Sequence, residues 1–301
     1  PYATSLRMGK LGYQSDAQSS LIVCYNDIDQ YTKTLKGALE TPYQRYADSG
    51  LKDSAGNYKQ LSTNLLQIEN EFYSPIRPKR NAVNGETPLE ALYKHGVEYI
   101  EVRCIDLNPL VAGGIDKQTM QFIDTFLLLC LFKESPKTNN DEYRQITENQ
   151  RRTVSRGRDP ELELVDGDQE RNLVEWGLAL IEEMRPIAAT LNSAHETTDY
   201  LDVLATMKAR LEGTSLTPAA QLLVEMADNN ETYYRMAMRK ACEQREQFNA
   251  VALAPDVIEK YQSLAAKSLQ KQKDIEQSDT ISFDDYLAAY YQRGRMIAES
   301  N

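Results

Sequence analysis

Cysteine and histidine are scarce in this sequence. The four cysteines among its 301 residues form no C-x-x-C pair and lie far apart, at Cys24, Cys104, Cys130 and Cys242. That spacing gives no zinc signature, is too sparse for a disulfide framework, and favours a reducing, cytoplasmic setting. The two histidines, His95 and His195, stand in no recognisable catalytic motif, so a histidine-rich metal site is excluded. Any chemistry therefore depends on carboxylates, arginines and tyrosines.

Long apolar runs and an excess of positive charge are also missing. The longest strongly apolar run extends only from Phe126 to Phe132, whereas a membrane-spanning helix needs about 20 residues. Lys and Arg total 34 against 45 Asp and Glu, which gives a net charge of −11. Because an acidic chain repels a phosphate backbone, we expect neither nucleic acid nor a membrane as a partner. The 41% of hydrophobic and 26% of charged residues are typical of a globular protein.

The two portions 1–115 and 116–301 differ in character. Strand-like segments are confined to the first portion, and after Gly113-Gly114 helical patterns dominate to the end. We therefore predict an α+β fold, in which a sheet-containing portion, 1–115, is covered by a helical portion, 116–301. The chain also opens on Pro1, without an initiator methionine, a signal peptide or a transit segment. This opening predicts that the chain is a piece of a longer protein.

Helical periodicity predicts helices over most of the chain. In the first portion they run from Asn26 or Asp27 to Thr41 and from Pro88 to His95. The most apolar candidate, Asp116–Glu134, is predicted to be buried nearly all round. The others are expected at 141–156, 168–192, 198–212, 217–229, 231–249, 256–277 and 282–298, with N-cap signals at Thr217-Pro218 and at Ser282 with Asp285.

The segment Val97–Asp106, VEYIEVRCID, alternates as a strand does. Its apolar residues fall on one face, and Glu101 and Arg103 fall together on the other. A carboxylate beside a guanidinium suits a metal–phosphate group, because the carboxylate can hold Mg²⁺ while the arginine neutralises phosphoryl charge. The alternative is a solvent-exposed ion pair on an ordinary antiparallel sheet, and the spacing alone favours that alternative.

A second predicted strand, Asn64–Tyr73, places Glu69 and Glu71 on one face. Such a pair could hold Mg²⁺ or act as acid and base, or it could simply face solvent. The basic connector that follows, Pro75–Arg80, could contact nucleotide phosphates or be a solvated loop. No glycine-rich phosphate loop of the Walker or Rossmann type is present.

Four segments, in this order, carry a family resemblance: PYATSLR at 1–7, LGY at 11–13, LQIENEFYSPIRPKR at 66–80 and VEYIEVRCIDLNP at 97–109. Through them the chain resembles the C-terminal part of bacterial glutamate–cysteine ligase, also called γ-glutamylcysteine synthetase. The resemblance is dense over the first third of the chain and faint over the helical remainder. Long motifs of mixed chemistry are more specific than any single spacing, so they favour the functional interpretation of Glu101 and Arg103.

The resemblance implies a fold related to the glutamine-synthetase-like carboxylate–amine ligases, in which an antiparallel sheet curves into a funnel with helices outside. It also implies a reaction, the first step of glutathione biosynthesis: ATP phosphorylates the γ-carboxylate of L-glutamate, and the amine of L-cysteine displaces the phosphate, with Mg²⁺ as the cofactor. Two alternatives remain open. The chain could be a non-catalytic helical interaction or regulatory module of the same fold, or a related ligase with another amine acceptor.

The matching motifs imply roles for five residues. Arg103 would be catalytic, neutralising the γ-phosphoryl group, and Glu101 would be a Mg²⁺ ligand. Arg7 would pair with a substrate carboxylate, while Tyr13 and Tyr73 would form part of the cysteine pocket. The N-terminal part of the family, which carries further acidic metal ligands, is not in this sequence. The resemblance therefore implies that the chain alone is inactive and that an N-terminal polypeptide completes the site.

Overall fold

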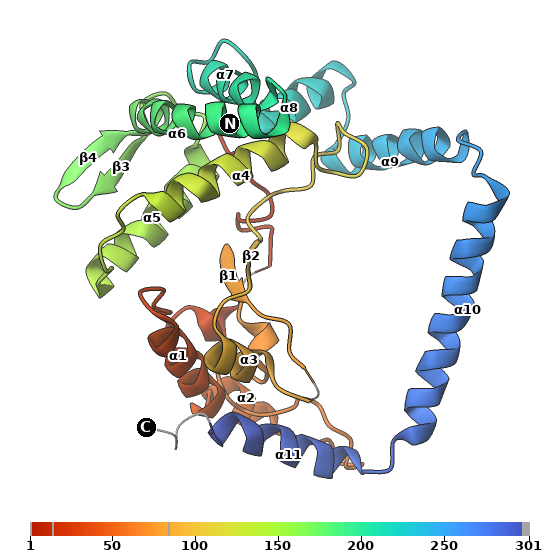
Figure 1. The fold of residues 1–301 in the computed structure, drawn as a ribbon. Helices are drawn as coiled ribbons and strands as arrows, with labels where there is room; N and C mark the ends of the chain where they lie inside the picture. The colour runs from red at the N-terminus through yellow and green to blue at the C-terminus, as the bar shows by residue number, and fades with distance from the viewer. Residues whose placement is uncertain (1, 14, 84, 297–301) are drawn as a thin grey trace. The chain divides into compact units, whose positions relative to one another are not determined.

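The computed structural model describes residues 2–13, 15–83 and 85–296. Its regular elements are mostly helices, accompanied by two sheets of two strands each (Figure 1). The fold is therefore α+β, as predicted, with a large helical part. Two predicted features extend beyond the described residues: Pro1 of the first motif and positions 297–298 of the last helix.

The chain divides into two compact units, each built from separate stretches of sequence. One unit comprises Pro1–Asp27, Ser74–Arg77 and Glu101–Lys240, and the other comprises Ile28–Tyr73, Pro78–Ile100 and Ala241–Asn301. Each unit draws residues from both sides of position 115. The division into portions 1–115 and 116–301 was predicted from the character of the sequence, and it stays a prediction.

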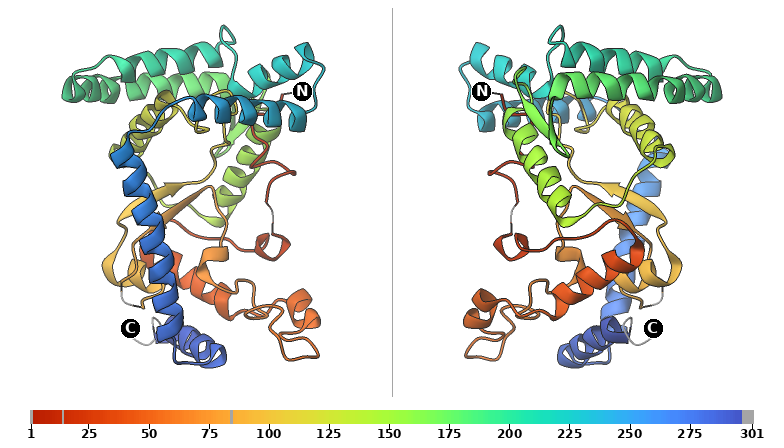
Figure 2. Two further views of the ribbon diagram at one scale, coloured as in Figure 1. Left: turned by 90° about the vertical axis from the view of Figure 1, so that its right-hand side faces the viewer. Right: turned by 90° about the vertical axis from the view of Figure 1, so that its left-hand side faces the viewer.

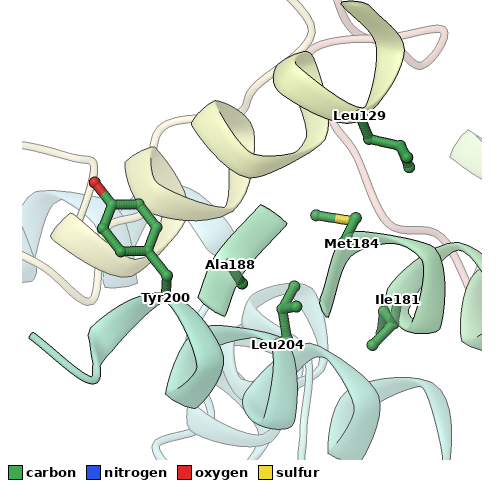
Figure 3. Close-up of a cluster of buried hydrophobic side chains, with 6 residues drawn as sticks. All are labelled: Leu129, Ile181, Met184, Ala188, Tyr200 and Leu204. Carbon is green, nitrogen blue, oxygen red and sulfur yellow. The ribbon is translucent and has the colours of Figure 1, made fainter. Parts of the chain in front are cut away.

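Three helices form the core of the first unit: α4 (Lys117–Phe132), α6 (Leu173–His195) and α7 (Asp199–Leu211). Asp116 caps α4 by accepting a hydrogen bond from the Thr119 N–H, and Asn172 caps α6 in the same way. The buried side chains between the helices are Leu129, Ile181, Met184, Ala188, Tyr200 and Leu204 (Figure 3). Removing this apolar surface from water is the main force that holds the three helices together.

The other elements of the first unit surround this core. They are η1 (Asp16–Gln18), α5 (Asn140–Arg156), α8 (Pro218–Asp228), the strands β3 (Glu163–Asp166) and β4 (Gln169–Asn172), and the first half of α9 (Tyr233–Asn249), as far as Lys240. β3 and β4 form an antiparallel hairpin, with Glu163 opposite Asn172. β4 occupies the start of the helix predicted at 168–192, so that part of the prediction is wrong and the helix begins only at Leu173. The Asn149 side chain joins α5 to β3, since it donates to the Val165 carbonyl and accepts from the Val165 N–H.

The helices described in the second unit are α1 (Ile28–Glu40), α2 (Gln44–Ser49), η2 (Glu69–Glu71), α3 (Pro88–His95), the second half of α9, α10 (Pro255–Ser278) and α11 (Phe283–Met296). α1 packs on α3, and α3 also contacts η2. The bounds of α3 match the prediction because its ends are encoded locally. Thr87 and Glu90 form a capping box at the start, and Gly96, with a φ of 73°, ends the helix.

The predicted strand over Asn64–Tyr73 is wrong. The segment lacks regular strand structure and contains the short 3₁₀ helix η2. Its backbone groups are satisfied without a neighbouring strand: the Leu66 N–H donates to the Ala38 carbonyl at the end of α1, and the Gln67 N–H donates to the Glu71 carboxylate. The alternating apolar residues of this segment therefore belong to an irregular chain bound to the end of α1, and not to a pleated strand.

Strands do form beside this segment, in β1 (Ile76–Lys79) and β2 (Tyr99–Val102), which pair with each other. β1 coincides with the basic connector, where no strand was predicted, and β2 is only the centre of the predicted strand Val97–Asp106. The hydrogen bonds Glu98 N–H to Lys79 O and Arg103 N–H to Pro75 O flank the pair. The sheet thus brings two of the family motifs, 66–80 and 97–109, into register.

Exposure differs from the prediction in α4. α4 buries only Gln121, Thr125 and Leu129, and its Leu131 and Phe132 are 73% and 75% exposed, so the predicted all-round burial is wrong. Every residue of α10 except Val257 is exposed, and Figure 2 shows α10 as one uninterrupted helix between α9 and α11. Among the residues that the structure describes, no helix is long and apolar enough to cross a membrane.

Candidate active site

Glu101 on β2 is held by an ion pair with Arg77 on β1. The Arg77 Nε lies 3.2 Å from Glu101 Oε2, and the side chains are 10% and 36% exposed. Pairing of the two strands brings these residues together across 24 positions of sequence. The site therefore contains a nearly buried guanidinium whose charge is balanced by a carboxylate that solvent still reaches.

Arg103 lies just past the end of β2, and its backbone is fixed. Its N–H donates to the Pro75 carbonyl at 2.7 Å, so the pairing with the β1 side continues beyond Val102. Glu101 and Arg103 are both half-buried and belong to the same unit. Their roles as metal ligand and catalytic residue stay predictions.

The loop that carries Arg7 is tethered by Asp106, a residue that the sequence interpretation missed. The Asp106 carboxylate accepts hydrogen bonds from Ser5 Oγ at 2.6 Å, from the Leu6 N–H at 2.7 Å and from the Arg7 N–H at 3.3 Å. Burial raises the pKa of the Cys104 thiol, and the nearby positive charge of Arg7 opposes that rise. The first and last family motifs thus meet in the first unit, and Asp106 sets the position of Arg7.

Substituting Asp106 should release the loop that carries Arg7. In a catalytically competent enzyme containing these residues, we expect Asp106→Ala to raise the KM of one amino-acid substrate by about tenfold to a hundredfold, because a misplacement of about 1 Å has effects of this size. Asp106→Asn, which keeps an acceptor oxygen, should recover part of this loss. Steady-state kinetics with each substrate varied in turn provide the measurement, and an unchanged KM for both amino acids would contradict the positioning role.

The two predicted tyrosines lie in different units. Tyr13 is in the first unit with its side chain 60% exposed. Tyr73 is half-buried in the second unit, directly after the buried Phe72. The structure therefore brings Arg7, Tyr13, Glu101 and Arg103 into one unit, and the contribution of Tyr73 to the same pocket stays a prediction.

One interpretation of this segment had Glu69 facing solvent, and for Glu69 that interpretation is wrong. It is only 6% exposed, and its carboxylate accepts a hydrogen bond from the Tyr290 hydroxyl on α11. The neighbouring Tyr291 hydroxyl donates to the Gln67 carbonyl at 2.8 Å. Burial, and then the hydrogen bond to Glu69, raise the pKa of the Tyr290 hydroxyl above its ordinary value. The C-terminal helix is thus fastened to the family motif at 66–80 by a hydroxyl that stays protonated.

Removing the Tyr290 hydroxyl should weaken the second unit. We expect Tyr290→Phe to lower the free energy of unfolding by about 1–2 kcal/mol at neutral pH, because the buried carboxylate loses its donor. An unfolded tyrosine titrates near pH 10, and the raised pKa means that the folded state holds the proton more tightly. The stabilisation is therefore present below about pH 10 and lost above it.

Urea unfolding of wild type and Tyr290→Phe at about pH 7 and pH 11 measures this effect. The difference in free energy of unfolding between wild type and Tyr290→Phe should be smaller at the higher pH. Tyr286→Phe, on the same helix but 50% exposed, is the matched control and should leave stability unchanged. Equal stability of wild type and Tyr290→Phe at neutral pH would contradict the proposed fastening.

The described residues contain single carboxylates that could be shared with a nucleotide-bound metal ion, but not a complete metal cage. Within the ranges described above, no three His, Cys, Asp or Glu residues are grouped so that they could hold an ion. Mg²⁺ bound to a nucleotide takes most of its oxygens from phosphates and water and needs only one or two carboxylates. Glu101, whose side chain is 36% exposed, fits that limited requirement.

Comparison with known families decides what these motifs belong to. The family model described as glutamate-cysteine ligase matches residues 1–153, which include Arg7, Tyr13, Tyr73, Glu101 and Arg103. The chain belongs to the glutamate–cysteine ligase family. The family resemblance predicted from the four motifs is thus confirmed.

Individual relatives extend the similarity over the helical remainder. The chain is 43% identical to the glutamate–cysteine ligase of Saccharophagus degradans over 301 residues, covering 99% of this chain and 57% of that protein. It is 40% identical to that of Pseudomonas fluorescens, covering 100% of this chain and 56% of the relative. The chain thus spans a little over half the length of these members of the glutamate–cysteine ligase family.

A solved structure supports the fold. The crystal structure of the glutamate–cysteine ligase of Francisella tularensis in complex with AMP is similar to this chain with a TM-score of 0.90 and 35% identity, over 99% of this chain and 58% of the other. The similarity includes the segments after residue 153, where the sequence resemblance was faint. The helical part is therefore shared with the glutamate–cysteine ligase fold.

Proposed function

We propose that this chain supplies part of the active site of an ATP-dependent ligase, which joins the γ-carboxylate of L-glutamate to the amine of L-cysteine. Membership of the glutamate–cysteine ligase family supports the reaction. The AMP in the similar Francisella enzyme supports a nucleotide as co-substrate. The single observation that carries the proposal is the placing of Glu101 in β2 and Arg103 just after it, with the loop of Arg7 tethered by Asp106, three residues after Arg103.

In this proposal the charged side chains act by position. Arg103 neutralises the charge that spreads over the transferring phosphoryl group and so favours the transition state over the ground state. Glu101, oriented by Arg77, provides one carboxylate oxygen to Mg²⁺, which neutralises nucleotide phosphate charge when bound. Arg7 binds a substrate carboxylate, and the hydroxyls of Tyr13 and Tyr73 hydrogen-bond cysteine.

The β1–β2 pair is proposed to belong to a larger curved sheet of the glutamine-synthetase-like funnel. Two paired strands of four residues each are too few to enclose a substrate, and an isolated pair is at most marginally stable. The matched relatives are nearly twice as long as the matched region, so the complete site includes residues from outside it. A separate N-terminal polypeptide gains no support from the relatives, which align along 99% or more of this chain.

A chimeric enzyme tests the proposal. The matched 57% of the Saccharophagus ligase is replaced by these 301 residues, and formation of ADP and γ-glutamylcysteine is measured with and without Mg²⁺. The control chimera carries the corresponding region of the Pseudomonas fluorescens relative in the same frame. We expect both chimeras to ligate glutamate to cysteine and this chain alone to be inactive.

The alternatives predict different results. A folded but inactive chimera beside an active control would overturn the ligase proposal and favour a non-catalytic module. Activity with another amine, but none with cysteine, would show a different acceptor. Robust ligation by the 301-residue chain alone would refute the proposed need for residues outside it.

A further inference from the structure

A cavity of about 670 Å³ lies in the first unit, apart from Glu101, Arg103 and Arg7. α4, α6 and α7 form its walls, and the turn after α5 and the start of α8 border it. Its volume falls within the 300–1,000 Å³ typical of pockets for small molecules. The proposed ligase reaction uses none of the residues that line it, so the cavity requires a separate explanation.

The walls are mainly apolar. They include Phe122 and Phe126 of α4, Leu180 and Met184 of α6, and Met207 of α7. Met184 is also part of the core cluster in Figure 3, so the floor of the cavity is continuous with the buried core. A hydrocarbon chain placed there would remove apolar surface from water on both sides.

One polar group in the lining has no partner. The Nε of Arg210, near the end of α7, is buried, and among the residues that the structure describes no acceptor lies within hydrogen-bond distance of it. Another nitrogen of the same guanidinium, Nη1, contacts the Met207 sulfur at 3.5 Å, a weak acceptor. A buried N–H without an acceptor is unfavourable, because it loses its hydrogen bond to water and gains none in the protein. The cavity thus combines an apolar interior with a donor of positive charge.

The remaining charges at the cavity are largely balanced. Asp159 is paired with Arg156 at 2.6 Å, and Glu212 lies 3.9 Å from Lys208. The Arg158 Nε donates to the Ala3 carbonyl at 3.1 Å. Asp116, whose pKa Arg210 helps to lower, already accepts a hydrogen bond from the Thr119 N–H as the N-cap of α4. Arg210 is therefore the group in the lining that a ligand acceptor would satisfy.

We propose that this cavity binds an amphiphilic monocarboxylate of the medium-chain fatty acid class. The hydrocarbon chain lies against Phe122, Met184 and Met207, and the carboxylate accepts the hydrogen bond of Arg210 Nε. A single anionic head matches the one unsatisfied donor, whereas a polyphosphate would place several charges against apolar walls. This proposal rests on the first unit alone and does not depend on the proposed ligase function.

Titration of the full 301-residue chain with decanoate tests the proposal, with 1-decanol as the uncharged probe of equal chain length. Among the eight methionines, Met184 and Met207 line the cavity, while Met236 is fully buried and absent from the lining. In methionine-methyl NMR, decanoate should shift the Met184 and Met207 signals and leave Met236 unchanged. Calorimetry should give about tenfold tighter binding of decanoate than of decanol, because the charged hydrogen bond is made by decanoate only.

Two substitutions separate the head-group contact from the apolar cavity. Arg210→Met should weaken decanoate binding by about tenfold or more and decanol binding by much less, because the decanol hydroxyl makes only an uncharged hydrogen bond. Arg185→Met is the matched control, since Arg185 lies on α6, pairs with Glu182 and is 54% exposed; it should affect neither ligand. Equal affinity for decanoate and decanol, decanoate binding unaltered by Arg210→Met, or shifts that spare Met184 and Met207 would each overturn the proposal.

Discussion

Arg103→Ala, introduced into the active chimera, is expected to lower kcat/KM by about 10³-fold or more. The estimate follows from the proposed role, because an arginine that stabilises a transferring phosphoryl group typically accounts for about 10³–10⁵ in rate. The Arg103 backbone is anchored to Pro75 by its own N–H, so the substitution removes the guanidinium without breaking that hydrogen bond. The loss should appear mainly in kcat, because the charge that Arg103 meets is greatest in the transition state.

Two further variants show whether the loss of kcat/KM is specific to the Arg103 guanidinium. Arg103→Lys keeps the positive charge but not the planar fork, and it should retain activity between the alanine variant and wild type. Arg144→Ala removes an exposed arginine of α5 that pairs with Asp141, and it should leave kcat/KM unchanged. If Arg103→Ala kept activity within about threefold of wild type, the proposed role in phosphoryl transfer would be wrong.

Helices were predictable from the sequence where capping residues next to a helix end mark its position. Thr217 before Pro218 and Ser282 with Asp285 each cap a helix in the structure at the predicted place. The capping box of Thr87 and Glu90, which was not predicted, fixes the start of α3 in a similar way. These signals depend only on residues within three positions of one another, so no tertiary information is needed to recognise them.

Strands were predicted less well because their partners lie far away in sequence. Alternation at 64–73 looked like a strand, but hydrogen bonds to the end of α1 and to side chains satisfied its backbone. The connector at 76–79 contains a proline and no alternation, yet it pairs with β2. Whether an extended segment becomes a strand depends on the partner that the fold supplies.

The candidate site was likewise predictable in part. The motifs identified Glu101 and Arg103 as residues of one strand region, but not Arg77 as the partner of Glu101, 24 positions earlier. Nor did any local signal connect Asp106 with Ser5, 101 positions apart. Such tethers arise only when the chain folds, although an aspartate at the last position of a predicted strand, inside a family motif, was a residue worth testing.

The second prediction concerns Glu101. The ion pair with Arg77 gives this residue a structural role in addition to the proposed metal role. Glu101→Gln keeps an oxygen that can accept from Arg77 Nε but loses the negative charge. We expect ligation in the chimera to fall by about 10²-fold through loss of a magnesium ligand, while the free energy of unfolding changes by less than about 1 kcal/mol. Steady-state kinetics over a range of Mg²⁺ concentrations and urea unfolding measure the two effects separately.

A double substitution distinguishes the metal role from a merely structural ion pair. Glu101→Leu alone removes the carboxylate that pairs with the nearly buried Arg77 guanidinium and should reduce stability by about 1–2 kcal/mol, a value discounted because the Glu101 side chain is 36% exposed. Adding Arg77→Met should restore stability, since the charge that lost this carboxylate is then removed as well. Activity should not return, because the carboxylate is still absent. Recovery of both stability and ligation in the double variant, or full activity of Glu101→Gln, would show that Glu101 only balances the charge of Arg77.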